Sequence, residues 1–118
     1  MTRTEETSRQ QKSNAEQYRV AFGSMPWDQA APGVRHKVYE QDGRRLRLAE
    51  FTEEFVEAEW CVNGHIGYVL EGRIEIDFNG NLVLLEAGDG LFIPAGEEHK
   101  HKARILTDRA RVILVEEM

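Results

Sequence analysis

Short apolar runs separated by turn residues fill the chain from about residue 34 to its end. The run 73–78 reads R-I-E-I-D-F, so its apolar side chains share one face and its charged side chains the other. The run 109–116 is apolar on both faces near its end, which indicates a position inside a sheet or between layers. Closely spaced strands of this kind predict an all-β domain, either a barrel or a jelly-roll sandwich. The predicted strands are 34–39, 45–51, 55–62, 65–70, 73–78, 82–86, 90–93, 99–106 and 109–116.

Turn-forming residues stand between these runs. Asn-Gly and Asp-Gly pairs tolerate a positive φ, and Pro or Gly ends a regular element. Upstream of the first run, the segments 25–27 and 31–33 contain prolines and predict a loop that packs one indole ring against the domain. The turn signals lie at 42–43, 63–64, 71–72, 79–80, 88–90 and 94–96.

The N-terminal part of the chain differs in character. Residues 1–17 are polar, with hardly any aromatic or branched side chains. Ser13 and Glu16 have the spacing of a capping box, which favours a short helix through Ala21. We therefore predict a polar arm over 1–20, disordered or briefly helical, followed by a single domain over 21–118, a length that can bury its own core.

Composition and charge narrow the classes of function. The 118 residues are 41% hydrophobic and 31% charged, with a net charge of -6, which is typical of a globular protein and speaks against nucleic acid as a partner. The sequence offers neither a signal peptide nor a membrane span, so we expect a cytoplasmic protein without a membrane partner. The single cysteine, Cys61, is either a small buried apolar residue, a reactive thiol or a metal ligand.

The turn at 63–64 determines which side chains meet Cys61. A two-residue hairpin would pair Val62 with His65, and Glu59 and Cys61 would then face away from His65. A three-residue loop with Gly64 in a left-handed bulge would instead pair Cys61 with His65. Glu59, Cys61 and His65 would then converge on one side.

Two motifs resemble those of the cupin superfamily. The stretch 88–99, G-D-G-L-F-I-P-A-G-E-E-H, is similar to the second cupin motif, which ends in a metal-binding histidine. The stretch 65–76, H-I-G-Y-V-L-E-G-R-I-E-I, looks like the first motif from its metal-binding glutamate onward. The resemblance implies a small, single-domain cupin: an all-β, cupin-type double-stranded β-helix (a jelly-roll barrel) with a polar N-terminal arm.

The first motif is atypical. His65 stands where the motif has its glutamate, Cys61 where it has the second histidine, and Glu59 where it has the first. The resemblance thus implies a metal site of Glu59, Cys61, His65 and His99. Zinc is the favoured ion because it accepts carboxylate, thiolate and imidazole together. Iron(II), nickel and manganese are alternatives, and Glu59, His65 and His99 alone would form the two-histidine, one-carboxylate set of non-haem iron.

Other side chains have weaker claims on the site. His101 shares a face with His99 and could replace Glu59 or Cys61 as a ligand, but we favour a role beside the metal, orienting a ligand or protonating a substrate as a catalytic group. Tyr68 is expected outside the cavity, and His36 on the surface. Arg47 and Arg73 could bind an anionic ligand only if their strands faced the opposite way.

Two classes of function fit this sequence. One is a small metalloenzyme acting on a small polar metabolite inside the barrel, with oxygenase, isomerase and lyase chemistry all open. The other is a non-catalytic, metal- or metabolite-binding sensor domain, which could also be metal-free. The resemblance further implies a homodimer, since cupins often pair their strands between subunits and exposed strand edges otherwise invite aggregation.

Overall fold

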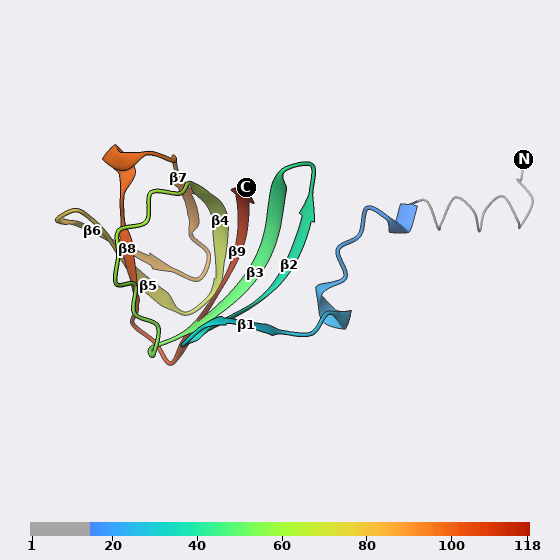
Figure 1. Cartoon of the computed structure of the whole chain (residues 1–118). Coiled ribbons are helices and arrows are strands. Elements are labelled where there is room, and N and C mark those ends of the chain that lie inside the picture. The colour runs from blue at the N-terminus through green and yellow to red at the C-terminus, as the bar shows by residue number, and fades with distance from the viewer. Residues whose placement is uncertain (1–14) are drawn as a thin grey trace, which may run out of the picture.

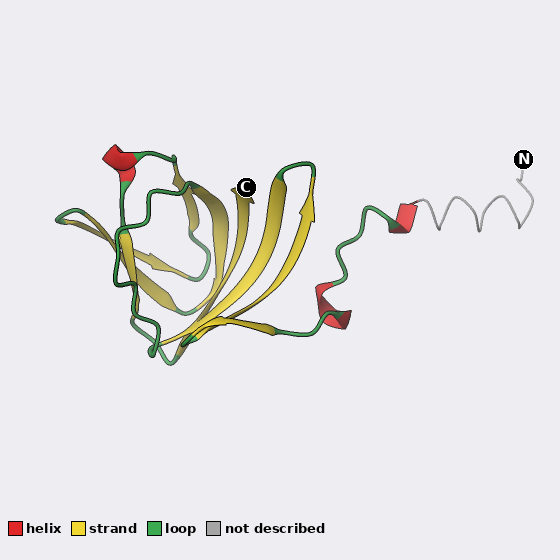
Figure 2. Cartoon of the chain, viewed as in Figure 1, coloured by secondary structure: helices red, strands yellow, loops and turns green. Residues whose placement is uncertain are grey.

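The computed structural model describes residues 15–118 and has an all-β architecture (Figures 1 and 2). The predicted capping residue Ser13, and most of the predicted N-terminal arm, lie outside the described residues. Residues 15–19, at the end of that arm, are exposed. Within the described part of the chain, no helix has the length and hydrophobicity needed to cross a membrane.

Two antiparallel sheets face each other and enclose the core (Figure 1). The larger sheet has six strands in the order β1-β2-β3-β9-β4-β7, and the smaller has three in the order β6-β5-β8. This arrangement confirms the predicted all-β jelly-roll barrel. The strands of the larger sheet are β1 (Asp28–Ala31), β2 (Val34–Gln41), β3 (Arg44–Thr52), β9 (Arg109–Glu117), β4 (His65–Glu71) and β7 (Gly90–Ile93). Those of the smaller sheet are β6 (Asn81–Glu86), β5 (Arg73–Phe78) and β8 (Lys102–Ile105), and two short 3-10 helices, η1 (Phe22–Ser24) and η2 (Glu97–His99), complete the elements.

The core lies where the alternating patterns predicted it. In β5, Ile74 and Ile76 point inward and are almost fully buried. In β9 every second residue is buried, and this register continues from Leu114 to Glu116, which places a carboxylate on the inner face of the barrel. The buried core comprises Val69, Ile74, Ile76, Ile93, Ile105, Ala110, Val112 and Leu114.

The segment 55–62, predicted as a strand, is irregular apart from one isolated bridge. That bridge joins Cys61 to His101 through two backbone hydrogen bonds of 2.8 and 3.0 Å. Both hairpin interpretations of 63–64 are therefore wrong. The reason is tertiary: Gly64 packs so tightly on the backbone of 93–95 that an added Cβ would lie 2.9 Å from the Ile93 carbonyl oxygen. This chain segment consequently pairs with the segment after β7 instead of folding back on β4.

Two further boundaries differ from the sequence-based expectation. The predicted strand over 99–106 begins only at Lys102, because His99 ends the η2 turn. The loop predicted around 31–33 contains the tight turn of a β1–β2 hairpin, in which Gly33 has a φ of 76°. Trp27 precedes β1, and its ring lies 4.4 Å from the Arg35 guanidinium.

Candidate metal centre

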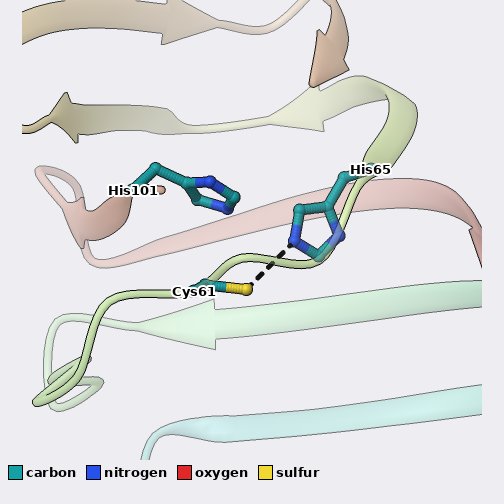
Figure 3. A group of neighbouring side chains, drawn as sticks. All are labelled: Cys61, His65 and His101. Atoms are coloured by element: carbon teal, nitrogen blue, oxygen red, sulfur yellow. Dashed lines mark hydrogen bonds between the residues drawn. The ribbon is translucent and has the colours of Figure 1, made fainter. Parts of the chain in front are cut away.

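Three side chains that can bind a metal ion converge inside the barrel: Cys61, His65 and His101 (Figure 3). One ligand atom from each lies within 4.8 Å of the other two. The Cys61 Sγ is 3.6 Å from the His65 Nε2. His65 is the first residue of β4, whereas Cys61 and His101 form the bridge described above. His101 is only 4% exposed, so this group lies within the barrel and not on its surface.

Both histidine rings have a fixed orientation. The His101 Nδ1 lies 3.0 Å from the backbone carbonyl oxygen of His99, and the His65 Nδ1 lies 2.7 Å from Oε2 of Glu116. A carbonyl oxygen or a carboxylate only accepts hydrogen bonds, so each Nδ1 donates its proton to its partner. With the Nδ1 protonated in this way, the nitrogen that can offer a lone pair to a metal ion is Nε2. This is the ring orientation that metal-binding histidines adopt when an outer acceptor holds the other nitrogen.

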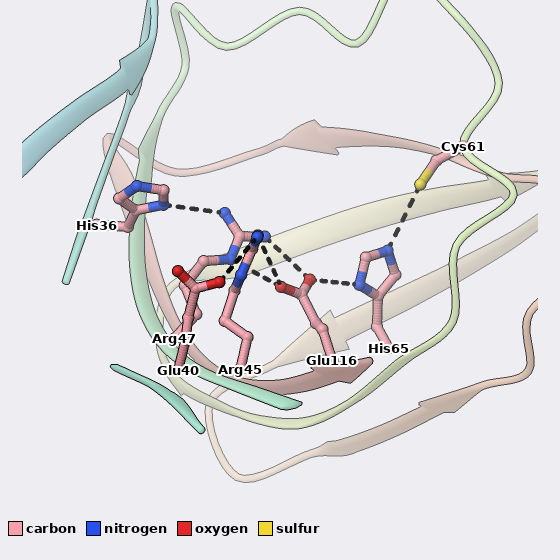
Figure 4. Close-up of polar contacts among 7 residues, drawn as sticks. All are labelled: His36, Glu40, Arg45, Arg47, Cys61, His65 and Glu116. Atoms are coloured by element: carbon pink, nitrogen blue, oxygen red, sulfur yellow. Dashed lines mark hydrogen bonds and ion pairs between the residues drawn. The ribbon is translucent and has the colours of Figure 1, made fainter. Parts of the chain in front are cut away.

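Glu116 is the anchor of this arrangement (Figure 4). Arg47 donates two hydrogen bonds to it, from Nε and from a terminal nitrogen, each 3.1 Å long. Burial by itself raises the pKa of the Glu116 carboxyl, but the hydrogen bond with His65 and the charge of Arg47 outweigh burial and lower the pKa to about 2. Glu116 is therefore ionised at neutral pH and can hold the His65 ring in place.

The Cys61 thiol lies in a different environment. Burial raises its pKa above the ordinary value, so the thiol keeps its proton when no metal is bound. In that state the thiol can donate to the Nε2 of His65, along the contact drawn in Figure 3. A metal ion must displace this proton to gain the thiolate as a ligand.

The structure brings together only part of the ligand set that the motifs imply. Cys61 and His65 are in the converging group, and His101 is there with them. Among residues 15–118, the group includes neither Glu59, which is exposed, nor His99. The His99 side chain is 40% exposed, and its Nε2 lies 3.7 Å from a carboxylate oxygen of Glu98.

Several residues around the site were not expected there. Arg47 was expected to face away from the cavity, but it lines the cavity. His36 was expected on the surface, but it is partly buried, and its Nδ1 lies 3.4 Å from a terminal nitrogen of Arg47 (Figure 4). Burial and the charge of Arg47 lower the pKa of His36, so it is neutral at pH 7. Glu116 could have been found from the sequence, because it keeps the parity of Val112 and Leu114 along the last strand. Tyr68 is 47% exposed, as expected for a residue outside the cavity.

A cavity of about 570 Å³ runs through the barrel. Strand register separates its two ends: Arg45 lies opposite Glu116 at one end, and Phe51 lies opposite Ala110 at the other. The first end also holds the three converging side chains and is polar, whereas mostly aliphatic and aromatic side chains, with Glu57 among them, line the rest. Such a cavity suits a small molecule, with its polar groups fixing the orientation of the ligand.

Comparison with known proteins agrees with this description. Residues 61–116 match the family model of the cupin domain. KdgF from Halomonas sp. is similar in structure, with a TM-score of 0.65 and 22% identity over 81% of this chain and 91% of that one. The polyketide cyclase RemF from Streptomyces resistomycificus has a TM-score of 0.69 and 20% identity over 84% of this chain and 78% of that one.

An RmlC-like cupin from Shewanella frigidimarina has a TM-score of 0.69 and 15% identity, over 85% of this chain and 89% of that one. At these identities the structural likeness establishes the fold alone. A search of curated proteins finds no match. The family match shows a cupin domain over residues 61–116 of this chain, and the two-sheet barrel and these neighbours have the same fold.

Proposed function

We propose that this cupin binds a divalent transition metal through Cys61, His65 and His101, and acts as a metalloenzyme on a small molecule held in the cavity. The observation that carries the proposal is the orientation of the two rings. Each Nδ1 is occupied by an acceptor outside the group, which directs Nε2 of His65 toward the cysteine sulfur and leaves Nε2 of His101 available. Without a metal to bind, a barrel core would have little need for two imidazoles with matched tautomers beside a thiol.

The donor set fits zinc best. A thiolate with two imidazoles is a soft to borderline set, which favours zinc, with iron(II) and nickel as alternatives, and disfavours manganese. Zinc sites with three protein ligands keep one position for water or substrate, whereas four protein ligands close the site. A bound zinc ion would supply Lewis-acid chemistry and lower the pKa of a coordinated water.

The surrounding residues of this chain have separate tasks in the proposal. Glu116 holds the His65 ring and balances the charge of Arg47, so it is a positioning residue. The His99 backbone carbonyl does the same for His101, which gives His99 a structural part although its side chain lies apart from the group. The aliphatic and aromatic part of the lining offers apolar contacts to the body of a bound molecule.

Metal content tests this proposal directly. Protein expressed with zinc, iron, nickel and manganese available is expected to contain close to one equivalent of metal, mainly zinc, by plasma mass spectrometry. Cys61→Ser, which keeps the size of the side chain but removes the soft ligand, is expected to retain less than a tenth of it. A wild-type protein without metal even after reconstitution would contradict the metalloenzyme and leave a metal-free binding barrel.

We also propose that the protein forms a homodimer through the outer face of the larger sheet. On that face Ile66 lies directly opposite Phe92 and Val115, and all three are substantially exposed, Phe92 by 74%. Burying them against a second copy would remove a continuous apolar patch from water. Light scattering is expected to give twice the mass of one chain for the wild type and a single-chain mass for Phe92→Asp. A wild type with the mass of one chain would contradict the dimer.

A further inference from the structure

The polar end of the cavity holds an arginine with unused hydrogen-bond donors. The Nε of Arg45 is buried, and among residues 15–118 it is the one buried side-chain nitrogen or oxygen without a hydrogen-bond partner. Its terminal nitrogens lie 3.9 Å from Oε1 of Glu116 and 3.7 Å from Oε2 of Glu40, beyond ordinary hydrogen-bond length. Figure 4 shows its side chain beside that of Arg47, close to Glu116.

The neighbouring arginine shows the contrast. Arg47 places its planar fork on both oxygens of Glu116, which leaves that carboxylate little capacity for a second arginine. The Nε of Arg45 therefore lacks an acceptor within the described chain, although the residue lines the cavity and its side chain is 37% exposed. A buried N–H donor without an acceptor carries a free-energy cost, and a ligand that supplies an acceptor would remove this cost.

The charges around Arg45 limit what this acceptor can be. Arg45 and Arg47 face the carboxylates of Glu40 and Glu116, while His36 beside Arg47 adds an imidazole. A planar carboxylate matches the guanidinium fork and adds a single negative charge. A phosphate would add up to two negative charges close to Glu40 and Glu116, and it would be repelled more strongly.

The lining of the rest of the cavity indicates the chemical character of the remainder of the ligand. From Arg45 the register runs toward Phe51, and the lining between the two ends includes Phe55, Leu91 and Leu114. We propose that Arg45 binds the carboxylate of a small monocarboxylic acid whose apolar body lies along this lining. This rests on the proposed function in that the ligand occupies the same cavity. Glu116 touches both Arg47 and His65, so the carboxylate would lie at the end of the cavity that holds the three metal-binding side chains.

Benzoate is a suitable probe, because it has one carboxylate, an apolar ring and no second group to chelate a metal. Benzamide has the same shape without the charge. Isothermal titration calorimetry on metal-free and on zinc-loaded protein is expected to show benzoate binding at least tenfold more tightly than benzamide. Arg45→Gln is expected to weaken benzoate at least tenfold in both forms and to leave benzamide unchanged.

Arg44→Gln is the matched control: it removes the same charge from an exposed position on the same strand and is expected to bind benzoate as the wild type does. Arg45→Lys keeps the charge without the fork and is expected to show intermediate affinity. Absence of benzoate binding by the wild type, equal binding by Arg45→Gln, or tighter Arg45-dependent binding of inorganic phosphate would overturn the proposal. The metal-free titrations separate these outcomes from a failure of the metal site, which metal analysis of the same samples detects.

Discussion

Replacing His101 by alanine is expected to weaken zinc binding by roughly a thousandfold, because the change removes one of three ligands from a buried site. His99→Ala is the matched control, two residues away and outside the converging group. Its side chain is 40% exposed and the backbone carbonyl that orients His101 survives the substitution, so zinc affinity should stay within about threefold of the wild type. Competition with a chromophoric chelator measures both affinities.

This pair of variants distinguishes the structure from the motif. The second cupin motif implies His99 as the ligand, whereas the three-dimensional arrangement has His101 inside the barrel. Loss of zinc in His99→Ala with retention in His101→Ala would restore the assignment by motif and contradict the group described here. Circular dichroism of both variants shows whether the barrel remains folded.

Glu116→Gln is expected to remove about 3 kcal/mol of stability from the metal-free protein at pH 7. The carboxyl has a pKa of about 2 in the folded protein against an ordinary value of 4.5, and a lowered pKa favours the folded state whenever the group is ionised there. The sign is that of a carboxylate: the stabilisation is complete above about pH 4.5 and is lost as the pH falls toward 2. The free energies of unfolding of wild type and variant, measured in urea, should therefore become equal as the solution is acidified.

Glu117→Gln provides the control for this series. It removes the same charge from the next residue of β9, which is exposed. Its stability should follow that of the wild type at every pH. If the difference in free energy of unfolding between wild type and Glu116→Gln did not decrease from neutral to acidic pH, the role assigned to the ionised Glu116 carboxylate would be contradicted.

The sequence was informative about the barrel because local patterns determine most of it. Alternation in 73–78 predicted the inner face of β5, and the Asp42-Gly43 turn predicted the hairpin between β2 and β3, where both residues have positive φ. These features depend on near neighbours in the chain, so periodicity and turn chemistry reveal them. The two motifs added the superfamily, which the family match confirms over residues 61–116.

The site was harder to predict because its members meet through distant contacts. A hairpin turn does not bring Cys61 next to His65. Cys61 lies there because the backbone of Cys61 pairs with that of His101. That pairing depends on the close approach of Gly64 to the chain after β7, and no local sequence pattern predicts this approach. The short η2 turn then displaces His99 from the strand register that would have aligned it with His101.

The charged residues of the cavity illustrate the same limit. Arg47 faces inward because β3 pairs with β9 in a register that sets Arg45 and Glu116 opposite each other, across a large sequence separation. The inner and outer faces of β3 cannot be told apart from its own sequence, since arginines alternate with aliphatic residues along it. Only the partner strand decides which set faces the core.

The central claim is that Cys61 binds a metal ion together with His65 and His101, and cobalt substitution tests it most directly. Cobalt(II) bound by a thiolate gives an intense sulfur-to-metal charge-transfer band in the near ultraviolet, which imidazole and carboxylate ligands do not produce. We predict this band at one equivalent of cobalt in the wild type, its loss in Cys61→Ser, and its persistence in His99→Ala. A wild-type protein that binds cobalt without the band, or whose band survives Cys61→Ser, would contradict the site.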